Sequence, residues 1–338
     1  MRDLLEDLDR LALSGPVGRA VVTSVWGSAP RPPGATLIAT REGRMAGSVS
    51  GGCVEAATVE AIRQAMDAGA PRLLRFSVSD NKAWEVGLSC GGAIEIFVEP
   101  GIRPEVAAAA KSGREEAVLS VIEGPLPLGP APPLLHQAAE PEVRAALAGH
   151  ASRVARIPLP EGGEALVLVE VFPKQPTLLI IGAVHIAETL ARLARPLGYR
   201  VVVADARVPL LTRERFPDAE LIPGWPDEAF ARVSVDEATF VCVLTHDPKF
   251  DDPAVRLALA SPAPYIGVIG SRKTQKDRRE RLRAAGIGEE QLARVRGPIG
   301  LELGGREPAE IALAILAELT AVRHGAAPAG RGIGAHAG

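Results

Sequence analysis

Two patterns of hydrophobic and polar positions divide the chain near residue 175. The first part has short stretches rich in β-branched residues, separated by turns that contain Gly or Pro, which is typical of strands. This pattern predicts strands at 19–26, 35–40, 45–49, 72–78, 93–99, 117–122, 154–158 and 165–172. Helices are predicted at 1–14, 54–69, 104–112 and 141–148, so the first part is expected to be an α+β domain.

Strands and helices alternate in the second part. Apolar stretches predict strands at 178–181, 200–204, 219–222, 240–244 and 265–269, with helices between them, beginning with 186–197 and closing with 307–324. Such alternation predicts a parallel sheet with helices on both faces. The fold class is therefore α/β, with a Rossmann-like doubly wound sheet in the C-terminal part.

The domain boundaries follow from these patterns. We expect a first domain at 1–173 and a Rossmann-like domain at 177–324, joined by a Pro-containing linker at 172–176. The remaining segment, 325–338, is rich in Gly and Ala and is predicted to be disordered.

Composition narrows the class of protein. A formal net charge of −3 and a pI near 6.1 give no reason to expect nucleic acid or an anionic membrane as a partner. Three cysteines indicate a reducing compartment rather than a disulfide-stapled secreted domain. The acidic N-terminus lacks the apolar core of a signal peptide, and no apolar run approaches membrane-spanning length, so a cytoplasmic location is expected.

The first candidate site is the loop that contains Ser50, Gly51, Gly52 and Cys53, just before the predicted helix at 54–69. A helix start leaves backbone N–H groups unpaired, and glycines remove side-chain bulk around them. These free donors and the helix dipole would provide a seat for an anion. The same position would favour the thiolate form of Cys53.

A second glycine-flanked cysteine follows before the strand at 93–99, in a loop formed by Gly87, Ser89, Cys90, Gly91 and Gly92. We expect the two loops to face each other and to hold a ligand, with Cys53 and Cys90 at a soft metal. Two cysteines are too few for a closed zinc site. Burial as small hydrophobic side chains, a disulfide and a persulfide are the alternatives. Cys242, within a core strand, is expected to be structural.

A glycine loop also follows the first strand of the second part. Gly182 opens it and His185 stands at the start of the next helix, while Asp205 ends the next strand. This is the setting of a Rossmann dinucleotide site. Val184 stands where the middle glycine of the fingerprint would lie and would crowd a pyrophosphate, so nucleotide binding stays open.

Polar residues follow two further strands of the same predicted sheet. His246 and Asp247 come after the strand at 240–244, and Ser271 and Arg272 come after the strand at 265–269. Ligands of such sheets bind at the carboxyl ends of the strands, and Ser271 and Arg272 would suit a phosphate. Helix capping and surface charge are the alternative interpretation. No motif of a hydrolase or a kinase is present.

Together these motifs resemble the XdhC/CoxI family. The first part carries GSAPRPPGATLIA, GSVSGGCVE and GLSCGGAIEIFVEP, and the second carries LLIIGAVHIAETLARLA, IGVIGSRKT and GPIGLELGGREPAEIALAILAEL. The resemblance implies an accessory protein, not an enzyme, that binds the molybdenum cofactor and protects it while its sulfido ligand is installed. The cofactor is then inserted into a xanthine dehydrogenase-type apo-enzyme. It further implies a sulfur donor of the cysteine desulfurase type and a homodimer.

The residues alone leave two other functions open. The Rossmann-like module would suit an NAD(P)-dependent oxidoreductase with His185 and Asp205 around the cofactor. A bridge between Cys53 and Cys90 would suit a thiol redox sensor.

Overall fold

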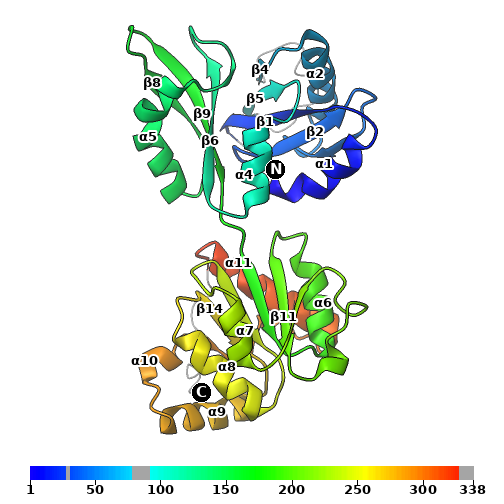
Figure 1. The fold of residues 1–338 in the computed structure, drawn as a ribbon, viewed down its shortest axis with the longest axis vertical. Helices are drawn as coiled ribbons and strands as arrows, with labels where there is room; N and C mark the ends of the chain where they lie inside the picture. Colours follow the sequence, from blue (N-terminus) through cyan, green and yellow to red (C-terminus); the bar gives the residue numbers. More distant parts are fainter. Residues whose placement is uncertain (28–30, 78–91, 327–338) are drawn as a thin grey trace. The chain divides into compact units, whose positions relative to one another are not determined.

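The computed structural model of the chain describes residues 1–27, 31–77 and 92–326 (Figure 1). The chain forms two compact units, Met1–Lys174 and Gln175–Gly338. Most of the predicted tail, 327–338, lies outside the described residues. Within the described part of the chain, no helix combines the length and the apolar composition that crossing a membrane requires.

The first unit contains two antiparallel sheets. The five-stranded sheet has the order β3 (Met45–Gly47), β2 (Thr36–Thr40), β1 (Val17–Trp26), β5 (Ala93–Glu99) and β4 (Arg72–Phe76). The second sheet has the order β7 (Gly129–Pro130), β6 (Glu116–Glu123), β9 (Glu164–Phe172) and β8 (Arg153–Pro158). The helices of this unit are α1 (Leu5–Ala12), α2 (Glu55–Ala68), α4 (Pro104–Ser112) and α5 (Pro133–Ala148).

The alternation of side chains along the strands builds these elements into layers. One face of the five-stranded sheet packs Leu37 and Ile96 against Ile62 of α2. Its other face packs Phe97 against Leu168 of the second sheet. The outer face of the second sheet is covered by α5. Helix α2 therefore lies over the five-stranded sheet, on the face away from the second sheet.

Helix α5 is longer than the sequence pattern predicts. It begins at Pro133 and not at 141, and Pro141 lies inside it. A proline in the helix interior removes one backbone hydrogen bond, which is why the pattern indicates a helix start there. Burial of Leu135, Ala139 and Ala146 on both sides of Pro141 supports the continuous helix.

The second unit is a doubly wound parallel sheet, which confirms the predicted fold class. Its order is β12 (Glu220–Pro223), β11 (Arg200–Asp205), β10 (Thr177–Ile181), β13 (Thr239–Val243), β14 (Tyr265–Val268) and β15 (Val295–Arg296). The order corresponds to the 3-2-1-4-5-6 arrangement of the Rossmann fold. The pattern missed β15, which is only two residues long.

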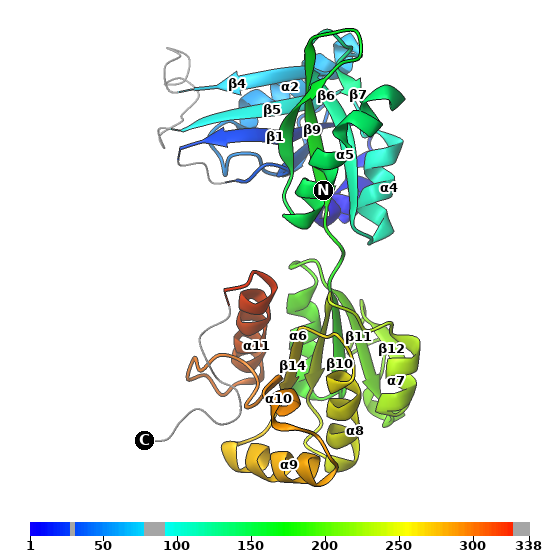
Figure 2. The same cartoon turned by 90° about the vertical axis from the view of Figure 1, so that its left-hand side faces the viewer.

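Helices cover both faces of this sheet because alternate strand residues point to opposite sides (Figure 2). On one side, Leu178 and Ile180 belong to a core built with α6 (His185–Ala194) and α11 (Pro308–Arg323). On the other side, Leu179 and Ile181 belong to a core built with α7 (Pro226–Arg232), α8 (Pro248–Leu259) and α9 (Arg272–Ala284). The topological switch lies between β10 and β13, where ligands of this fold bind.

A buried arginine joins the two sheets of the first unit. The Arg19 side chain on β1 is fully buried and donates to Glu99 of β5 at 2.7 Å and to Glu170 of β9. The other oxygen of Glu99 accepts from Arg103 at the start of α4, at 2.6 Å. Arg75 makes a second bridge between the sheets, to Glu95 and Glu123, but its side chain is 58% exposed.

We expect Arg19→Met to lower the free energy of unfolding by about 3–5 kcal/mol, because it leaves buried carboxylates without their partner. The matched variant Arg75→Met removes the exposed bridge and should cost less than about 1 kcal/mol. Urea unfolding of the full chain, followed by circular dichroism, compares the two. Equal losses would contradict the assigned role of burial.

Candidate functional site

The loop between β3 and α2 carries the first glycine–cysteine motif. The chain leaves the sheet at Ser48, whose N–H donates to Thr36 O at 3.0 Å, and the helix begins at Glu55. Gly51 and Gly52 have φ values of 82° and 126°, a region that favours glycine. The two glycines therefore let the loop turn tightly between strand and helix.

The Glu55 carboxylate fills the concave side of this loop. Its two oxygens accept hydrogen bonds from four backbone N–H groups and two hydroxyl groups. The donors are Val49 N at 3.2 Å, Ser50 N at 2.9 Å, Gly51 N at 3.0 Å, Gly52 N at 2.8 Å, Ser48 Oγ at 2.6 Å and Ser50 Oγ. The anion that these donors bind is therefore the Glu55 carboxylate, which belongs to the same chain.

This arrangement corrects one expectation and supplies a residue that the sequence reasoning missed. The N–H groups of Gly51 and Gly52 were expected to be unpaired, but Glu55 takes both. Burial alone raises the pKa of Glu55, yet the hydrogen bonds from Ser48 and Ser50 outweigh it and lower the pKa to about 2. Glu55 is therefore ionised at neutral pH.

Cys53 lies half-buried on the same loop. Its N–H donates to Ser50 Oγ at 3.0 Å, and its side chain packs against the core between α2 and the five-stranded sheet. Val25 and Phe76, near the ends of β1 and β4, pack against the same core. The loop that carries Cys53 leaves β3 at the end of the sheet where β1 also ends, because β3 runs parallel to β1.

The second glycine–cysteine loop joins β4 to β5 at that same end of the sheet. Gly87, Ser89, Cys90 and Gly91 lie outside the described residues, whereas Gly92 is buried just before β5. The strand pairing places Phe76, the last residue of β4, opposite Ile94, and Trp26 of β1 opposite Ala93. Figure 2 shows the ends of β1, β4 and β5 side by side. That the two loops face each other stays a prediction.

Resident metal binding has no support in the described part of the chain. No group of three or more His, Cys, Asp or Glu side chains there is arranged to hold a metal ion. Cys242 on β13 is fully buried, and this burial raises the pKa of its thiol. Of the two described cysteines, Cys242 is buried and Cys53 is partly buried.

In the second unit, the loop after β10 packs tightly at the switch point. Gly182 has a φ of 113°, and a Cβ built there would lie 2.6 Å from Thr245 Cγ2, so only glycine fits. His185 is exposed and begins α6, and Val184 precedes it in extended conformation. The loop therefore has the Rossmann turn but a bulky residue at its middle position.

Asp205, at the end of β11, organises this loop. Its carboxylate accepts from Ala183 N at 2.7 Å and from Arg207 at the backbone N, Nε and Nη2, at 2.8–3.0 Å. Burial raises its pKa, but the hydrogen bonds from Arg207 and Ala183 prevail and lower it. Its side chain has no exposed surface, so a nucleotide contact through Asp205 stays a prediction.

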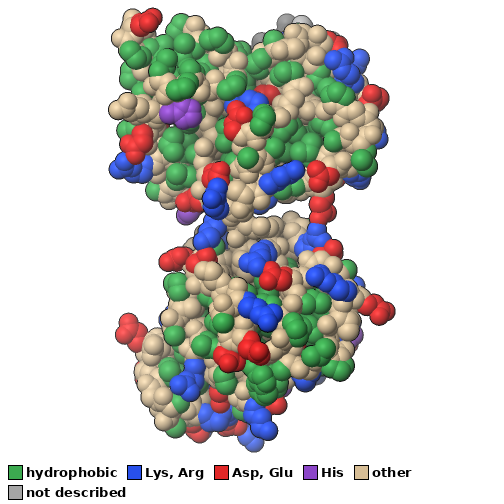
Figure 3. All heavy atoms as spheres, viewed as in Figure 1, with side chains coloured by type: hydrophobic (Ala, Val, Ile, Leu, Met, Phe, Trp, Pro, Cys, Tyr) green, Lys and Arg blue, Asp and Glu red, His purple; other side chains and the backbone are tan. Residues whose placement is uncertain are grey.

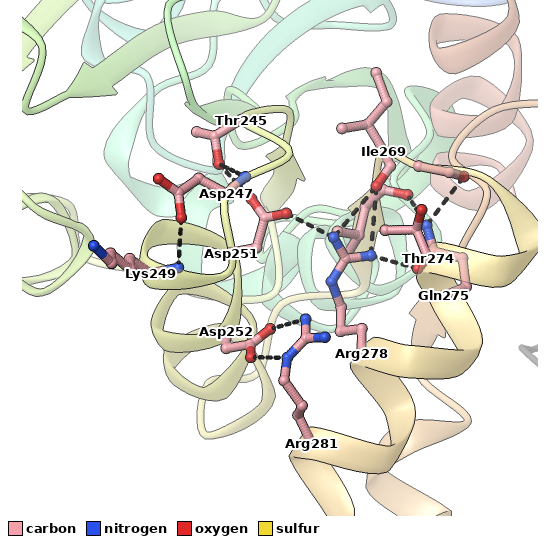
Figure 4. Close-up of polar contacts among 12 residues, drawn as sticks. Thr245, Asp247, Lys249, Asp251, Asp252, Ile269, Thr274, Gln275, Arg278 and Arg281 are labelled. Carbon is pink, nitrogen blue, oxygen red and sulfur yellow. Dashed lines mark hydrogen bonds and ion pairs between the residues drawn. The ribbon is translucent and has the colours of Figure 1, made fainter.

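A buried ion pair holds the loops after β13 and β14 together (Figure 4). Arg278 of α9 donates to Asp251 of α8 at 2.6 Å, to Gln275 at 2.6 Å and to the Ile269 carbonyl at 3.4 Å. The Thr245 hydroxyl donates to the other oxygen of Asp251. Figure 4 shows Arg278 between Asp251 and the backbone that follows β14. The two loops are thereby fixed relative to each other.

The predicted polar residues of these loops lie at the surface. His246 is exposed and has a φ of 67°, and the Asp247 carboxylate caps α8 by accepting from Lys249 N at 3.0 Å. Ser271 caps α9 in the same way, and Arg272 is exposed. Helix capping, the alternative interpretation, therefore describes Asp247 and Ser271. Ligand binding by the four residues stays a prediction.

Comparisons with known proteins decide the family. Residues 11–77 match the model of the XdhC and CoxI family, and residues 178–319 match the model of the XdhC Rossmann domain. The chain belongs to the XdhC and CoxI family. Within the family model of the first unit lie the whole Ser48–Glu55 loop and α2.

This XdhC-family chain is similar in sequence to three curated proteins. It is 28% identical over 335 residues to a protein of Bacillus subtilis described as a probable subunit of xanthine dehydrogenase, covering 95% of both chains. It is 28% identical over 318 residues to the molybdenum cofactor insertion chaperone PaoD of Escherichia coli, covering 92% of this chain and 86% of PaoD. The uncharacterised protein YqeB of Escherichia coli is 25% identical over 313 residues, and the chain spans 44% of its length.

A solved structure shows the same fold. The crystal structure of a xanthine dehydrogenase from Bacillus halodurans has a TM-score of 0.76 at 23% identity, covering 98% of each chain. This likeness concerns the fold alone.

The depressed pKa of Glu55 gives a pH-dependent stability. The ionised form is favoured in the folded state, so its contribution is complete above the ordinary value of 4.5 and is lost as pH falls towards about 2. We expect Glu55→Gln to melt below the wild type at pH 6, with the gap closing between about pH 4.5 and 2. Calorimetry over this range measures the gap.

The matched control is Glu60→Gln on the same helix, because Glu60 is exposed and its hydrogen bonds within the described residues come from Arg63 and Gln64. It should melt close to the wild type throughout. A gap for Glu55→Gln that does not change with pH would contradict the assignment.

Proposed function

We propose that the chain is an accessory protein that binds the molybdenum cofactor and delivers it to a molybdenum hydroxylase of the xanthine dehydrogenase type. Family membership and the PaoD relative, itself a molybdenum cofactor insertion chaperone, support this role. The observation that carries it is Cys53, a partly buried cysteine whose backbone is held by Ser50. Its loop leaves β3 at the end of the sheet where β4 ends and β5 begins.

The residues present suit a metal complex carried as cargo. A resident metal needs three or four protein ligands, which the described residues do not gather. A metal that arrives with its own ligands needs only one or two more, and thiolate sulfur is a suitable soft donor. We assign Cys53 and Cys90 to the metal end of the cofactor. Protection during sulfuration belongs to the same proposal, since half-burial of Cys53 limits access of water and oxidants.

The proposed partners are an apo molybdenum hydroxylase, a sulfur donor of the cysteine desulfurase type and a second copy of the chain, in the cytoplasm. The surface is consistent with protein partners. On the face shown in Figure 3, basic and acidic side chains are interspersed over each unit. The net charge of −3 adds no attraction for polyanions.

A nicotinamide-dependent oxidoreductase is the alternative, because the second unit has the Rossmann strand order and the Gly182 turn. The Asp205 carboxylate argues against it. In Rossmann enzymes this acidic residue binds the ribose hydroxyl. Here its oxygens are bound to Ala183 N and Arg207 and are buried.

We therefore expect no saturable binding of NADH or NADPH up to millimolar concentration. Fluorescence titration of the full chain measures this. Binding in the micromolar range would favour the oxidoreductase instead.

The three cysteines allow a matched test of the cofactor proposal. Cys53→Ser and Cys90→Ser should each lower retention of molybdopterin by at least about tenfold, because losing even an outer-shell partner of a metal typically costs 10- to 100-fold. Cys242→Ala, the buried control, should retain it like the wild type. Retention is measured after mixing and gel filtration. Equal retention by all four proteins would refute the proposed site.

A further inference from the structure

The backbone N–H groups of the glycine–cysteine loop bind a carboxylate of the same chain, that of Glu55. Four consecutive N–H groups, from Val49 to Gly52, point at the Glu55 carboxylate. Such a run of donors is a typical binding site for phosphate or another anion. With Glu55 in place, a phosphate at this loop would meet a carboxylate and not free donors.

The carboxylate also fixes Cys53, through one intermediate side chain. The Ser50 hydroxyl donates to Glu55 and accepts from the backbone N–H groups of Cys53 and Val54, both at 3.0 Å. Ser50 is 2% exposed and Glu55 is 7% exposed, so both contacts are shielded from water. The position of the Cys53 backbone therefore depends on Glu55.

The charge of Glu55 is balanced by dipoles and not by a cation. Among the described residues, its hydrogen-bond partners are backbone N–H groups and two serine hydroxyls, without a Lys or Arg side chain. A second negative charge close by is therefore unfavourable. The charge of Glu55 therefore disfavours a phosphate at the loop.

We propose that Glu55 is the positioning residue of Cys53, and that this loop receives the metal end of the cargo while the cargo's phosphate binds elsewhere. The second clause rests on the proposed function. The first does not, because it concerns the loop itself. Glu55 occupies the place of an external anion and, through the Ser50 hydroxyl, fixes the backbone that carries the thiol.

The test replaces the carboxylate and then returns an anion from solution. Glu55→Ala in the full chain empties the four-donor site and removes the acceptor of the Ser50 hydroxyl, so the backbone of Cys53 loses its fixed position. We expect alkylation of Cys53 by iodoacetamide at pH 7 to become about tenfold faster, because a loop that opens more often exposes its thiol more often. Formate should bind the emptied site and slow the reaction towards the wild-type rate.

Each cysteine can be followed separately by mass spectrometry, since trypsin places Cys53, Cys90 and Cys242 in the different peptides 45–63, 83–111 and 233–249. Sodium chloride at equal ionic strength controls for salt. The matched variant Glu60→Ala removes an exposed carboxylate of α2 and should alkylate like the wild type, with or without formate.

An alkylation rate in Glu55→Ala equal to that of the wild type would overturn the positioning role, as would a faster rate that formate and chloride change alike. If Glu55→Ala does not fold, Ser50→Ala keeps the carboxylate and removes the intermediate hydroxyl. Cys53 alkylation should then also change, and an unchanged rate overturns the proposal.

Two further measurements separate this inference from the proposed function. If the wild type retains no molybdopterin but Glu55→Ala shows the formate-reversible change, the cargo assignment fails and the positioning role stands. Inorganic phosphate probes the second clause: it should protect Cys53 from alkylation in Glu55→Ala but not in the wild type. Protection of the wild type would show that the loop does bind phosphate.

Discussion

The Glu55 carboxylate is the contact on which the candidate site depends. Backbone N–H groups in a glycine turn must be paired when the turn is packed against a core, and this turn has four in succession. A single ionised side chain pairs them all and also satisfies two serines. The start of α2, the end of β3 and the position of Cys53 are thus set by one group.

In each unit, a buried guanidinium group joins elements that are distant in the sequence, as Glu55 joins the ends of one loop. Arg19 joins β1 to β5 and β9, and so ties the two sheets of the first unit. Arg278 joins α8 to the loop after β14, and so fixes the loops at the carboxyl ends of β13 and β14. Both are almost completely buried and paired with carboxylates, where an unpaired partner would be costly. The described candidate residues lie in loops that such buried contacts hold in place.

Sequence periodicity was sufficient for the elements and for the class of fold, because strand burial in a doubly wound sheet is visible as apolar runs such as 178–181. It failed where tertiary packing outweighs a local signal, as at Pro141 inside α5. The partners of the site residues were harder to foresee. A glutamate in the first turn of a helix usually indicates dipole stabilisation. Two serines and two glycines before Glu55 were the available signal for a reverse contact.

For the same reason, the acidic residue of the second unit has little capacity left to bind a nucleotide. Asp205 belongs to the Rossmann pattern by position, but Arg207, two residues later, donates to both of its oxygens, and Ala183 N donates to one of them as well. In both units, then, the acidic group next to a glycine turn is bound by the turn's own backbone. A turn whose backbone donors are already paired in this way cannot use them to bind an external anion. The groups beside the turn then determine what it can bind. In the first unit the group beside the turn is Cys53, and our proposal that it contacts a soft metal rests on this position.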